Sequence, residues 1–362
     1  MNYKIMGNII NIEVDDIDVR QVLIDEFKIY DEVREQADVN VYVVNTINFE
    51  GVYSNTPSIH KTFKNGFLAD FGGNKVLYKK EDVLSIYIEM NKKRSFLRKF
   101  ISMGYKNNID NIGQVLHELI FVPLNFFIEN KTIIHSSSMK NTKTGKSVMI
   151  GGTGGVGKTS MELLLCRDFD YSFISDDIAV VDDKCSIYPN LAFPKIYAYN
   201  LADNESLKNL IFKDRYFMDK FQWGFIKKFR GESKVRRVVS PDVLYKNFET
   251  NENDIDDYFI LYKSNNVNEI TISELSAKKA SALTLDIIKN EYHSVFQHIT
   301  WHEYNCELMN FEPIIKLEDT LVRWLEIYNK IFQSVNCFAI KIPVGIKHDQ
   351  FISEMKKAFN NG

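Results

Sequence analysis

The chain has 362 residues, of which 45% are hydrophobic and 26% charged, an ordinary composition for a globular protein with enough material for a core. Its formal net charge is −3, whereas a general nucleic-acid-binding surface is normally basic, so we expect no nucleic-acid partner. No apolar run approaches the roughly 20 residues that span a bilayer, and the four cysteines lack metal-ligand spacing. We therefore predict a cytoplasmic protein without a membrane partner.

The first part of the chain predicts a small α+β domain over residues 1–108, which would bind a substrate or partner. Its expected elements are strands at 3–14 and 39–49, a charged, periodic helix at 17–36, and further strands within 65–90. The basic segment at 91–106 indicates a solvated linker or helix face.

Residues 109–362 predict a larger α/β domain. A mostly buried helix over 111–130, which Pro123 should end or kink, precedes the informative stretch. The expected elements are then a strand at 131–139, a turn, a strand at 147–152, a glycine loop, a helix, and a strand within 171–181. This order is typical of α/β proteins. Beyond it we expect charged, irregular structure over 203–237, a strand near 256–264, helices from about 273, and a final strand and amphipathic helix.

Residues 152–159 read Gly-Thr-Gly-Gly-Val-Gly-Lys-Thr, which matches the P-loop pattern G-x-x-x-x-G-K-[ST] without a mismatch, between an apolar strand and a helix. Glycines allow backbone N–H groups to wrap a phosphate, because a Cβ would obstruct the close approach. We predict that the phosphates of a nucleotide bind Gly152, Thr153, Gly154, Gly155, Val156, Gly157, Lys158, Thr159 and Ser160. Lys158 would contact the β- and γ-phosphates, and Thr159 would bind Mg²⁺. The alternative is a glycine-rich turn that happens to precede a lysine.

Two adjacent carboxylates, Asp176 and Asp177, end the apolar strand that follows the P-loop helix. A carboxylate in this position commonly holds the Mg²⁺ that bridges the phosphates. Neighbours on a strand face opposite ways, so one aspartate could bind metal while the other accepts a proton from a serine-type hydroxyl. The alternative is an acidic strand end that enters a turn, which is the interpretation we favour for Asp182 and Asp183.

Together with His135 at a strand end, this order of motifs resembles the catalytic domain of the HPr kinase/phosphorylase family and its HPr-kinase-like relatives. The likeness covers residues 112–200 well and the rest of the chain more loosely. It implies a P-loop kinase domain related to phosphoenolpyruvate carboxykinase. It also implies that ATP and Mg²⁺ are used to phosphorylate a serine-type hydroxyl of a peptide, protein or small metabolite, and that a homo-oligomer could form.

Carried over by position, the resemblance implies that Asp176 is the general base and Asp177 a metal ligand, although the order of the two stays open. His135 would orient an aspartate or contact a phosphate; alternatively it is a strand-end histidine without a role. Either Arg236 or Arg237 could add positive charge near the transferred phosphoryl group, unless their stretch is a solvated loop.

Two other functions remain open, a non-catalytic nucleotide-binding regulator and a nucleotide hydrolase. A GTPase is disfavoured because the chain has no N-K-x-D motif. His298 and His302 lie four residues apart and would share a face of a helix, but their order differs from H-E-x-x-H, so we predict no metal site there.

Overall fold

The computed structural model describes residues 1–48, 51–90, 112–201, 204–213 and 215–360. Its N-terminal part is a seven-stranded sheet in the order β1-β2-β3-β7-β6-β5-β4. The strands are β1 (Asn2–Ile5), β2 (Asn8–Val14), β3 (Val39–Val44), β4 (His60–Phe63), β5 (Gly66–Phe71), β6 (Asn74–Lys80) and β7 (Leu84–Glu89). The strands expected within 3–14, 39–49 and 65–90 are therefore confirmed, while the segment 91–106 lies outside the described residues.

The helix α1 (Ile17–Phe27) is shorter than the expected 17–36. It starts where the Asp16 carboxylate accepts hydrogen bonds from two backbone N–H groups of the first turn. After Phe27 the chain returns along the edge of the sheet, where Val33 donates its backbone N–H to Asn2 and Lys4 donates to Asp31. The polar periodicity that suggested a helix belongs instead to an extended segment beside β1.

The C-terminal part contains a six-stranded sheet in the order β11-β9-β10-β17-β19-β18 and a four-stranded sheet in the order β16-β13-β12-β8. Its strands are β8 (Lys131–Ile134), β9 (Ser136–Asn141), β10 (Ser147–Gly152), β11 (Tyr171–Ser175), β12 (Ala179–Asp182), β13 (Ser186–Tyr188), β14 (Lys195–Tyr197), β15 (Arg236–Val238), β16 (Asn253–Asp254), β17 (Asp257–Ser264), β18 (Thr271–Glu274) and β19 (Asn336–Pro343). The fold is mixed α/β, as the sequence predicts.

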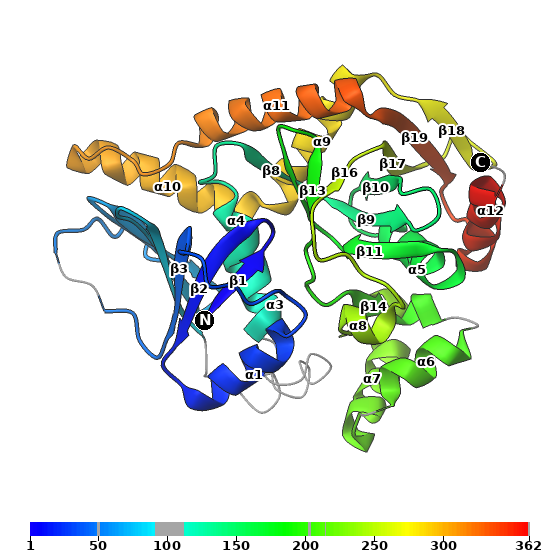
Figure 1. Ribbon diagram of the computed structural model, residues 1–362, viewed down its shortest axis with the longest axis horizontal. Coiled ribbons are helices and arrows are strands. Elements are labelled where there is room, and N and C mark those ends of the chain that lie inside the picture. Colours follow the sequence, from blue (N-terminus) through cyan, green and yellow to red (C-terminus); the bar gives the residue numbers. More distant parts are fainter. Residues whose placement is uncertain (49–50, 91–111, 202–203, 214, 361–362) are drawn as a thin grey trace.

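The helices of this part are α3 (Ile112–Leu116), the π-helix η1 (His117–Phe121), α4 (Val122–Leu124), α5 (Lys158–Asp168), η2 (Ala198–Leu201), α6 (Glu205–Phe212), α7 (Phe217–Arg230), η3 (Glu232–Lys234), α8 (Pro241–Leu244), α9 (Ala277–Glu291), α10 (His293–Met309), α11 (Leu317–Ser334) and α12 (His348–Asn360). The six-stranded sheet lies between two helical layers (Figure 1). One layer is formed by α9 and α11, and the other by α5 and α12. The P-loop helix is therefore covered by the C-terminal helix.

Two expectations for this part are wrong. Residues 203–237 are not irregular: their described residues include α6 and α7, and α7 is amphipathic because Asp219, Gln222, Trp223 and Ile226 face the interior at helical spacing. The helix expected from about residue 273 starts only at Ala277, because β18 occupies the preceding residues and pairs with β19.

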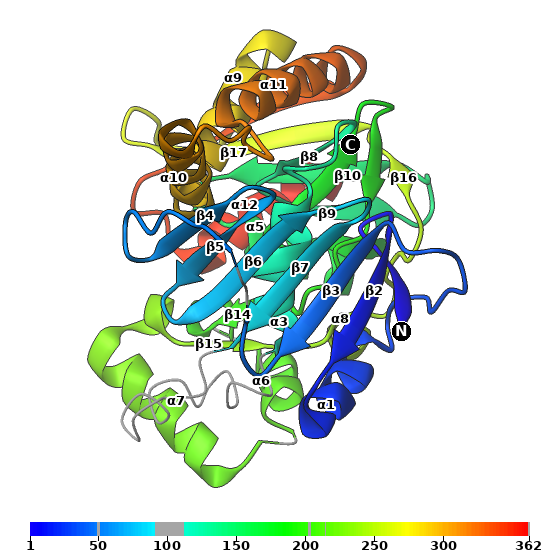
Figure 2. The ribbon, with the colours of Figure 1, turned by 90° about the vertical axis from the view of Figure 1, so that its left-hand side faces the viewer.

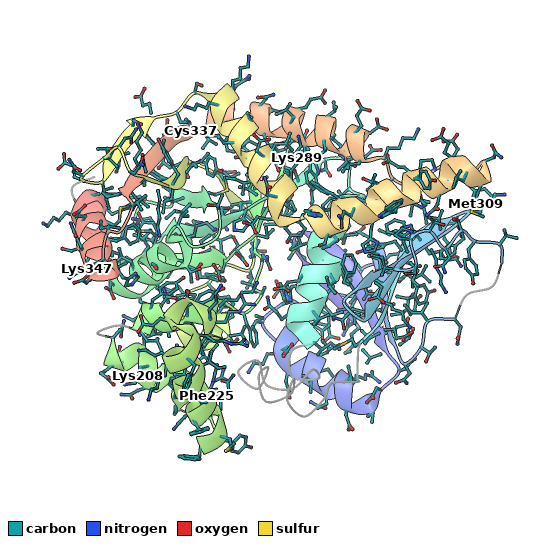
Figure 3. The ribbon with its side chains drawn as sticks, turned by 180° about the vertical axis from the view of Figure 1, so that it is seen from behind. Lys208, Phe225, Lys289, Met309, Cys337 and Lys347 are labelled. Atoms are coloured by element: carbon teal, nitrogen blue, oxygen red, sulfur yellow. The ribbon has the colours of Figure 1, made fainter. Side chains whose placement is uncertain are left out.

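The two parts meet along α10, which crosses the strands β4 and β5 of the seven-stranded sheet (Figure 2). Figure 3 shows α10 running out to Met309 above that sheet. The segment from α3 to α4 makes a second contact between the two parts. There His117 Nε2 and the Tyr30 hydroxyl share a 2.7 Å hydrogen bond. Pro123 lies in α4, and the helical segment ends one residue later, as predicted.

Candidate active site

Two chain crossings between sheets bring together the residues that the motifs single out. The chain leaves the four-stranded sheet after β8, passes through His135, and enters the six-stranded sheet as β9. It crosses back between β11 and β12, through Asp176 and Asp177. Because β8 pairs with β12 and β9 pairs with β11, both in antiparallel register, the two crossings lie side by side. The histidine and the aspartate pair, which are about forty residues apart in the chain, therefore share one site.

The P-loop starts at the end of β10, which pairs with β9 on one side and β17 on the other. Two glycines are required by its geometry. Gly152 has a φ of 138°, and a Cβ there would lie 2.6 Å from the carbonyl oxygen of Leu261. Gly157 has a φ of 117°, and a Cβ there would lie 2.9 Å from the ring of Phe351. The tip of the loop, Thr153 to Gly155, is exposed and accessible to a ligand.

Lys158 is 6% exposed and folds back over its own loop. Its Nζ donates to the carbonyl oxygens of Gly152 at 3.0 Å and Thr153 at 3.1 Å. Burial lowers the pKa of Lys158, and the carboxylates of Asp177 and Asp176 partly oppose that effect. A buried ammonium beside the exposed loop tip is the arrangement that a phosphate anion would stabilise.

The carboxylate of Asp176 is the junction between the P-loop and the sheet. Its Oδ1 accepts hydrogen bonds from Thr159 Oγ1 at 3.1 Å and from Ser137 Oγ at 3.0 Å. Its Oδ2 accepts a 3.3 Å bond from the backbone N–H of Lys195. The Thr159 hydroxyl and the Asp176 carboxylate are adjacent hard oxygen ligands, and Mg²⁺ at nucleotide sites uses one or two such carboxylates together with phosphate oxygens. This placement favours Asp176, rather than Asp177, as the metal ligand.

Asp177 faces the opposite way, with a half-exposed side chain. Its φ of 66° lies in the left-handed region, which few residues other than glycine adopt. Its Oδ2 accepts a 2.9 Å bond from Lys195, whose Nζ also lies 2.7 Å from Glu118 Oε1. Lys195 holds the pKa of Asp177 well below its usual range, more strongly than His135 and Lys158 do. Asp177 is therefore an ionised carboxylate that an incoming hydroxyl could reach.

The ion pairs of Lys195 shift the pKa values of the lysine and of its carboxylate partners. Burial alone would lower the pKa of Lys195, but the carboxylates of Asp177 and Glu118 outweigh it and raise that pKa. Burial would likewise raise the pKa of Glu118, but Lys195 reverses the shift and lowers it. Glu118 comes from η1, so a residue of the segment that packs against the N-terminal sheet contributes directly to the site.

His135 is 6% exposed, and neither of its ring nitrogens has a hydrogen-bond partner. Its Nε2 lies 3.5 Å from Asp177 Oδ1, and its Nδ1 lies 4.0 Å from Glu291 Oε1. Burial, together with the charge of Lys158, lowers the pKa of His135 to about 4. The ring is thus neutral at neutral pH. A buried imidazole without partners has a desolvation cost that a bound phosphate or hydroxyl would relieve.

A buried acid lies beneath the site. Glu162 of α5 is fully buried and accepts a hydrogen bond from the hydroxyl of Tyr245. Burial raises the pKa of Glu162 well above its ordinary value, and the nearby charge of Asp176 raises it further. Glu162 is therefore a supporting group that keeps its proton more readily than a surface glutamate.

The two candidate arginines have different surroundings, although both lie on β15. Arg237 is 1% exposed and donates to Asp219 at 2.7 Å and to Gln222 at 2.9 Å. Its guanidinium is buried beside α7 and held there by these hydrogen bonds. This argues against a catalytic role for Arg237, which was one of the two arginines that the sequence offered for that role. Arg236 donates a 2.8 Å bond to the Tyr197 hydroxyl, and its charge lowers the pKa of Lys195, so it lies next to the site.

His298 and His302 lie on α10 in a regular helix, and both rings point into the seam with the N-terminal sheet. There the ring of His298 contacts that of His60, with 3.2 Å between their Nδ1 atoms, while His302 Nδ1 lies 3.3 Å from Thr62 Oγ1. Within the described ranges, no group of three or more His, Cys, Asp or Glu could by itself hold a metal ion. Nor is any helix of the described residues long and apolar enough to cross a membrane.

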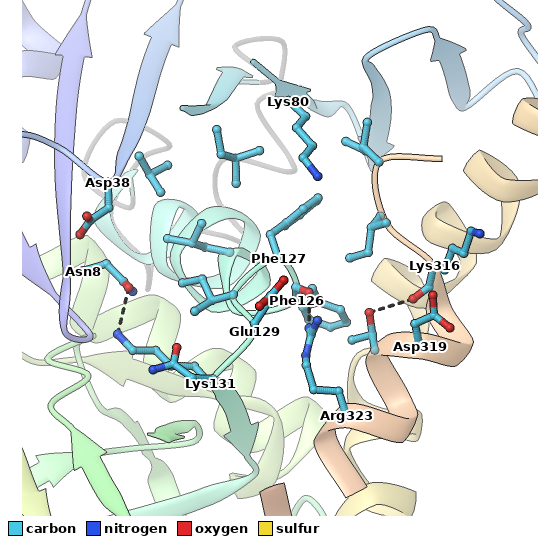
Figure 4. Close-up of a pocket in the computed structure, with 18 of the residues that line it drawn as sticks. Asn8, Asp38, Lys80, Phe126, Phe127, Glu129, Lys131, Lys316, Asp319 and Arg323 are labelled. Atoms are coloured by element: carbon cyan, nitrogen blue, oxygen red, sulfur yellow. Dashed lines mark hydrogen bonds between the residues drawn. The ribbon is translucent and has the colours of Figure 1, made fainter. Parts of the chain in front are cut away.

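A cavity of about 680 Å³ lies elsewhere, between the N-terminal sheet and α11. Figure 4 shows that cations and carboxylates alternate around it, with Lys80, Lys131 and Arg323 among Asp38, Glu129 and Asp319. The ammonium of Lys131 already has three hydrogen-bond acceptors there, because its Nζ donates to the Met6 and Gly7 carbonyl groups and to Asn8. No P-loop residue lines this cavity, and its mixed charges indicate no particular ligand.

Sequence reasoning missed Lys195, Glu118, Glu291 and Glu162. No motif marks Lys195, which stands alone in a short strand. Glu118 carried a usable signal, because it directly precedes the apolar run 119–124, a place where an unpaired charge is costly. Glu162 carried a similar signal in the P-loop helix, where it lies between Met161 and the three leucines 163–165.

A scan against protein-family models finds no match for this chain. A search of curated proteins finds no match either. The likeness to HPr-kinase-like proteins thus remains a hypothesis that rests on the motifs themselves.

Proposed function

We propose that the protein is an ATP- and Mg²⁺-dependent kinase that transfers a phosphoryl group to a serine-type hydroxyl of a peptide, protein or small metabolite. The proposed catalytic unit is a P-loop kinase domain of the HPr-kinase and phosphoenolpyruvate-carboxykinase type within residues 109–362. The N-terminal sheet would bind the acceptor or a partner. The observation that carries the proposal is the junction at Asp176, where a P-loop hydroxyl meets a carboxylate beside a second, differently oriented carboxylate.

On the nucleotide side, the backbone of the P-loop and the ammonium of Lys158 would bind the phosphates. Thr159 and Asp176 would hold Mg²⁺, which when bound neutralises charge on the transferred group. Arg236 would add positive charge from the edge of the site.

On the acceptor side, Asp177 would orient the hydroxyl and accept its proton. Its low pKa makes it a weak base, but the transition state of phosphoryl transfer is loose, so positioning matters more than basicity. The neutral ring of His135, 3.5 Å from Asp177, would hold that carboxylate or donate to the incoming phosphoryl group. Lys195 would keep Asp177 ionised.

The test is transfer from γ-labelled ATP with Mg²⁺ to a panel of serine peptides and small alcohols, for the wild type and for Asp177→Asn. The matched control is Asp254→Asn, which makes the same change at an exposed residue of β16. Transfer that is lost in Asp177→Asn, with nucleotide binding retained, supports the kinase. Phosphate release without an acceptor would identify a hydrolase, and binding without turnover a regulator.

A further inference from the structure

A second cavity, of about 280 Å³, opens beside the P-loop helix. Its lining residues come from parts of the chain that are far apart: one side of α5, the residues of α12 from His348 to Lys356, and Asn200 of η2 with Asn204 and Leu207 at α6. Helices α6 and α12 lie at the same end of the molecule, near the labelled Lys208 and Lys347 (Figure 3). The packing of α12 against α5 is therefore what closes this space.

The cavity begins where the P-loop ends. Ser160, the residue directly after the P-loop motif, lines it and accepts a 3.0 Å hydrogen bond at Oγ from the side-chain amide of Asn200. Ser160 stands in the first turn of α5, whose backbone N–H groups would bind phosphate. A ligand whose phosphates rest on the loop would thus have its non-phosphate end beside this cavity.

The lining combines an aliphatic surface, against which a flat ring could pack, with polar groups that could bind the edge of that ring. Four aliphatic side chains line the space: Leu163 and Leu164 of α5, Leu207 of α6 and Ile352 of α12. The rest of the lining is polar or charged, and it includes Asn200, Asn204 and the ion pair between Lys356 and Asp168. His348 also lines the cavity, and its imidazole lies 5.8 Å from the ring of Tyr199, which is outside the lining. In small-ligand sites, apolar surface packs against the rings of the ligand, and placed polar groups fix its orientation. The volume is just below the roughly 300–1,000 Å³ of such sites, so the cavity would take only a small part of a ligand, such as one base and its ribose.

From this arrangement we propose that the cavity between α5, α6 and α12 binds the nucleoside part, the purine base and ribose, of the triphosphate held by the P-loop. The inference rests on the proposed nucleotide binding. It adds the location of the contacts that would give the protein its affinity for the base. It assigns a function to the C-terminal helix, which would both support Gly157 through Phe351 and form one wall of the base site.

The experiment is isothermal titration calorimetry of the full chain with Mg²⁺ and, separately, ATP, GTP and inorganic tripolyphosphate. We expect both nucleotides, or one of them, to bind at least about tenfold more tightly than tripolyphosphate. Equal affinity for ATP, GTP and tripolyphosphate would overturn the nucleoside site while leaving phosphate binding at the P-loop intact. If none of the three binds, the proposed function fails together with the inference.

A substitution in the cavity tests whether the affinity for the nucleoside arises there. Ile352→Trp fills the cavity from α12 and should weaken ATP binding by about tenfold or more, while leaving the affinity for tripolyphosphate within about twofold. The control is Val344→Trp, which places the same ring on an exposed residue just before α12. A thermal melt of each variant checks folding. If Ile352→Trp is folded and binds ATP as the wild type does, the cavity is not the base site.

Discussion

Thr159 Oγ1 donates a 3.1 Å hydrogen bond to Asp176 Oδ1 and so joins the last residue of the P-loop motif to the end of β11. The sequence pointed to both residues, and the family resemblance implied that Asp177 binds the metal while leaving the order of the two aspartates open. In the structure Asp177 is turned away from Thr159 and toward Lys195 and His135. The two aspartates therefore have separable roles.

We expect Asp176→Asn and Asp177→Asn to fail in different ways. Asp176→Asn removes a charged oxygen ligand, so the Mg²⁺ concentration needed for half-maximal activity should rise by about tenfold or more. Asp177→Asn should lower kcat by about 10²–10⁴-fold with an unchanged Mg²⁺ requirement, because it removes the proton acceptor. Magnesium titrations of labelled-phosphate transfer measure both effects. The opposite pattern would show that the roles are exchanged.

The parts of the site that could be predicted are those encoded by neighbours in the chain. The P-loop and the aspartate pair are local patterns, and so are the alternating strands of the N-terminal sheet. Lys195 and Glu118 could not be placed, because 77 positions separate them and only the packing of η1 beside the start of β14 brings them together. The helix α7 was missed because its interior face includes Asp219 and Gln222, whose polarity hides the amphipathic pattern.

Lys195→Met should move the acid limb of the pH–rate profile. Lys195 is the main reason that the pKa of Asp177 is low, so its removal should let that pKa rise toward the ordinary value for aspartate. Because Asp177 must be ionised to accept a proton, activity should then fall at a higher pH than in the wild type. Measurement of kcat/KM from about pH 2.5 to 7 tests this, because the ordinary aspartate pKa is only about 3.9 and the wild-type limb lies below it. An unshifted acid limb would mean that Asp177 does not govern the rate.

Lys195→Arg is the matched control, since it keeps the charge beside Asp177 and Glu118. Its acid limb should stay near that of the wild type, whatever its effect on kcat. A shift as large as that of Lys195→Met would mean that side-chain geometry, rather than charge, sets the profile.

Glu162→Gln should stabilise the protein increasingly as the pH rises above about 5. Burial and the charge of Asp176 raise the pKa of Glu162 in the folded state, so the folded chain holds this proton after the unfolded chain has released it. Stability is lost as the pH rises past the unfolded pKa, at about 1.4 kcal/mol for each unit of the shift. Gln keeps an acceptor for the Tyr245 hydroxyl and does not titrate. Urea midpoints at pH 5 and pH 8 should therefore diverge between variant and wild type; parallel midpoints would contradict the raised pKa.

Three histidines form a second pH-dependent feature, at the seam between the N-terminal sheet and α10. His60 is fully buried, stacks on His298 with 5.4 Å between ring centroids, and hydrogen-bonds Thr62 at 2.9 Å. His302 is also fully buried, and its Nε2 accepts a 3.1 Å bond from the backbone N–H of Ile314. Burial, with the neighbouring histidines, lowers the pKa of His60 to about 3, and burial lowers the pKa of His302 to about 4.

The seam should therefore weaken in acid. Between about pH 6.5 and pH 4 the unfolded chain takes up protons at these rings and the folded chain does not, so the free energy of unfolding falls as the pH falls through that window. His302→Gln keeps an acceptor for Ile314 but cannot titrate, and it should remove up to about 3 kcal/mol of the acid-dependent loss. Urea unfolding at half-unit pH steps measures the slope, with His293→Gln, at the start of α10, as a control outside the cluster. Equal slopes for wild type and His302→Gln would show that His302 is not held neutral by its burial, and would place the acid sensitivity in other groups.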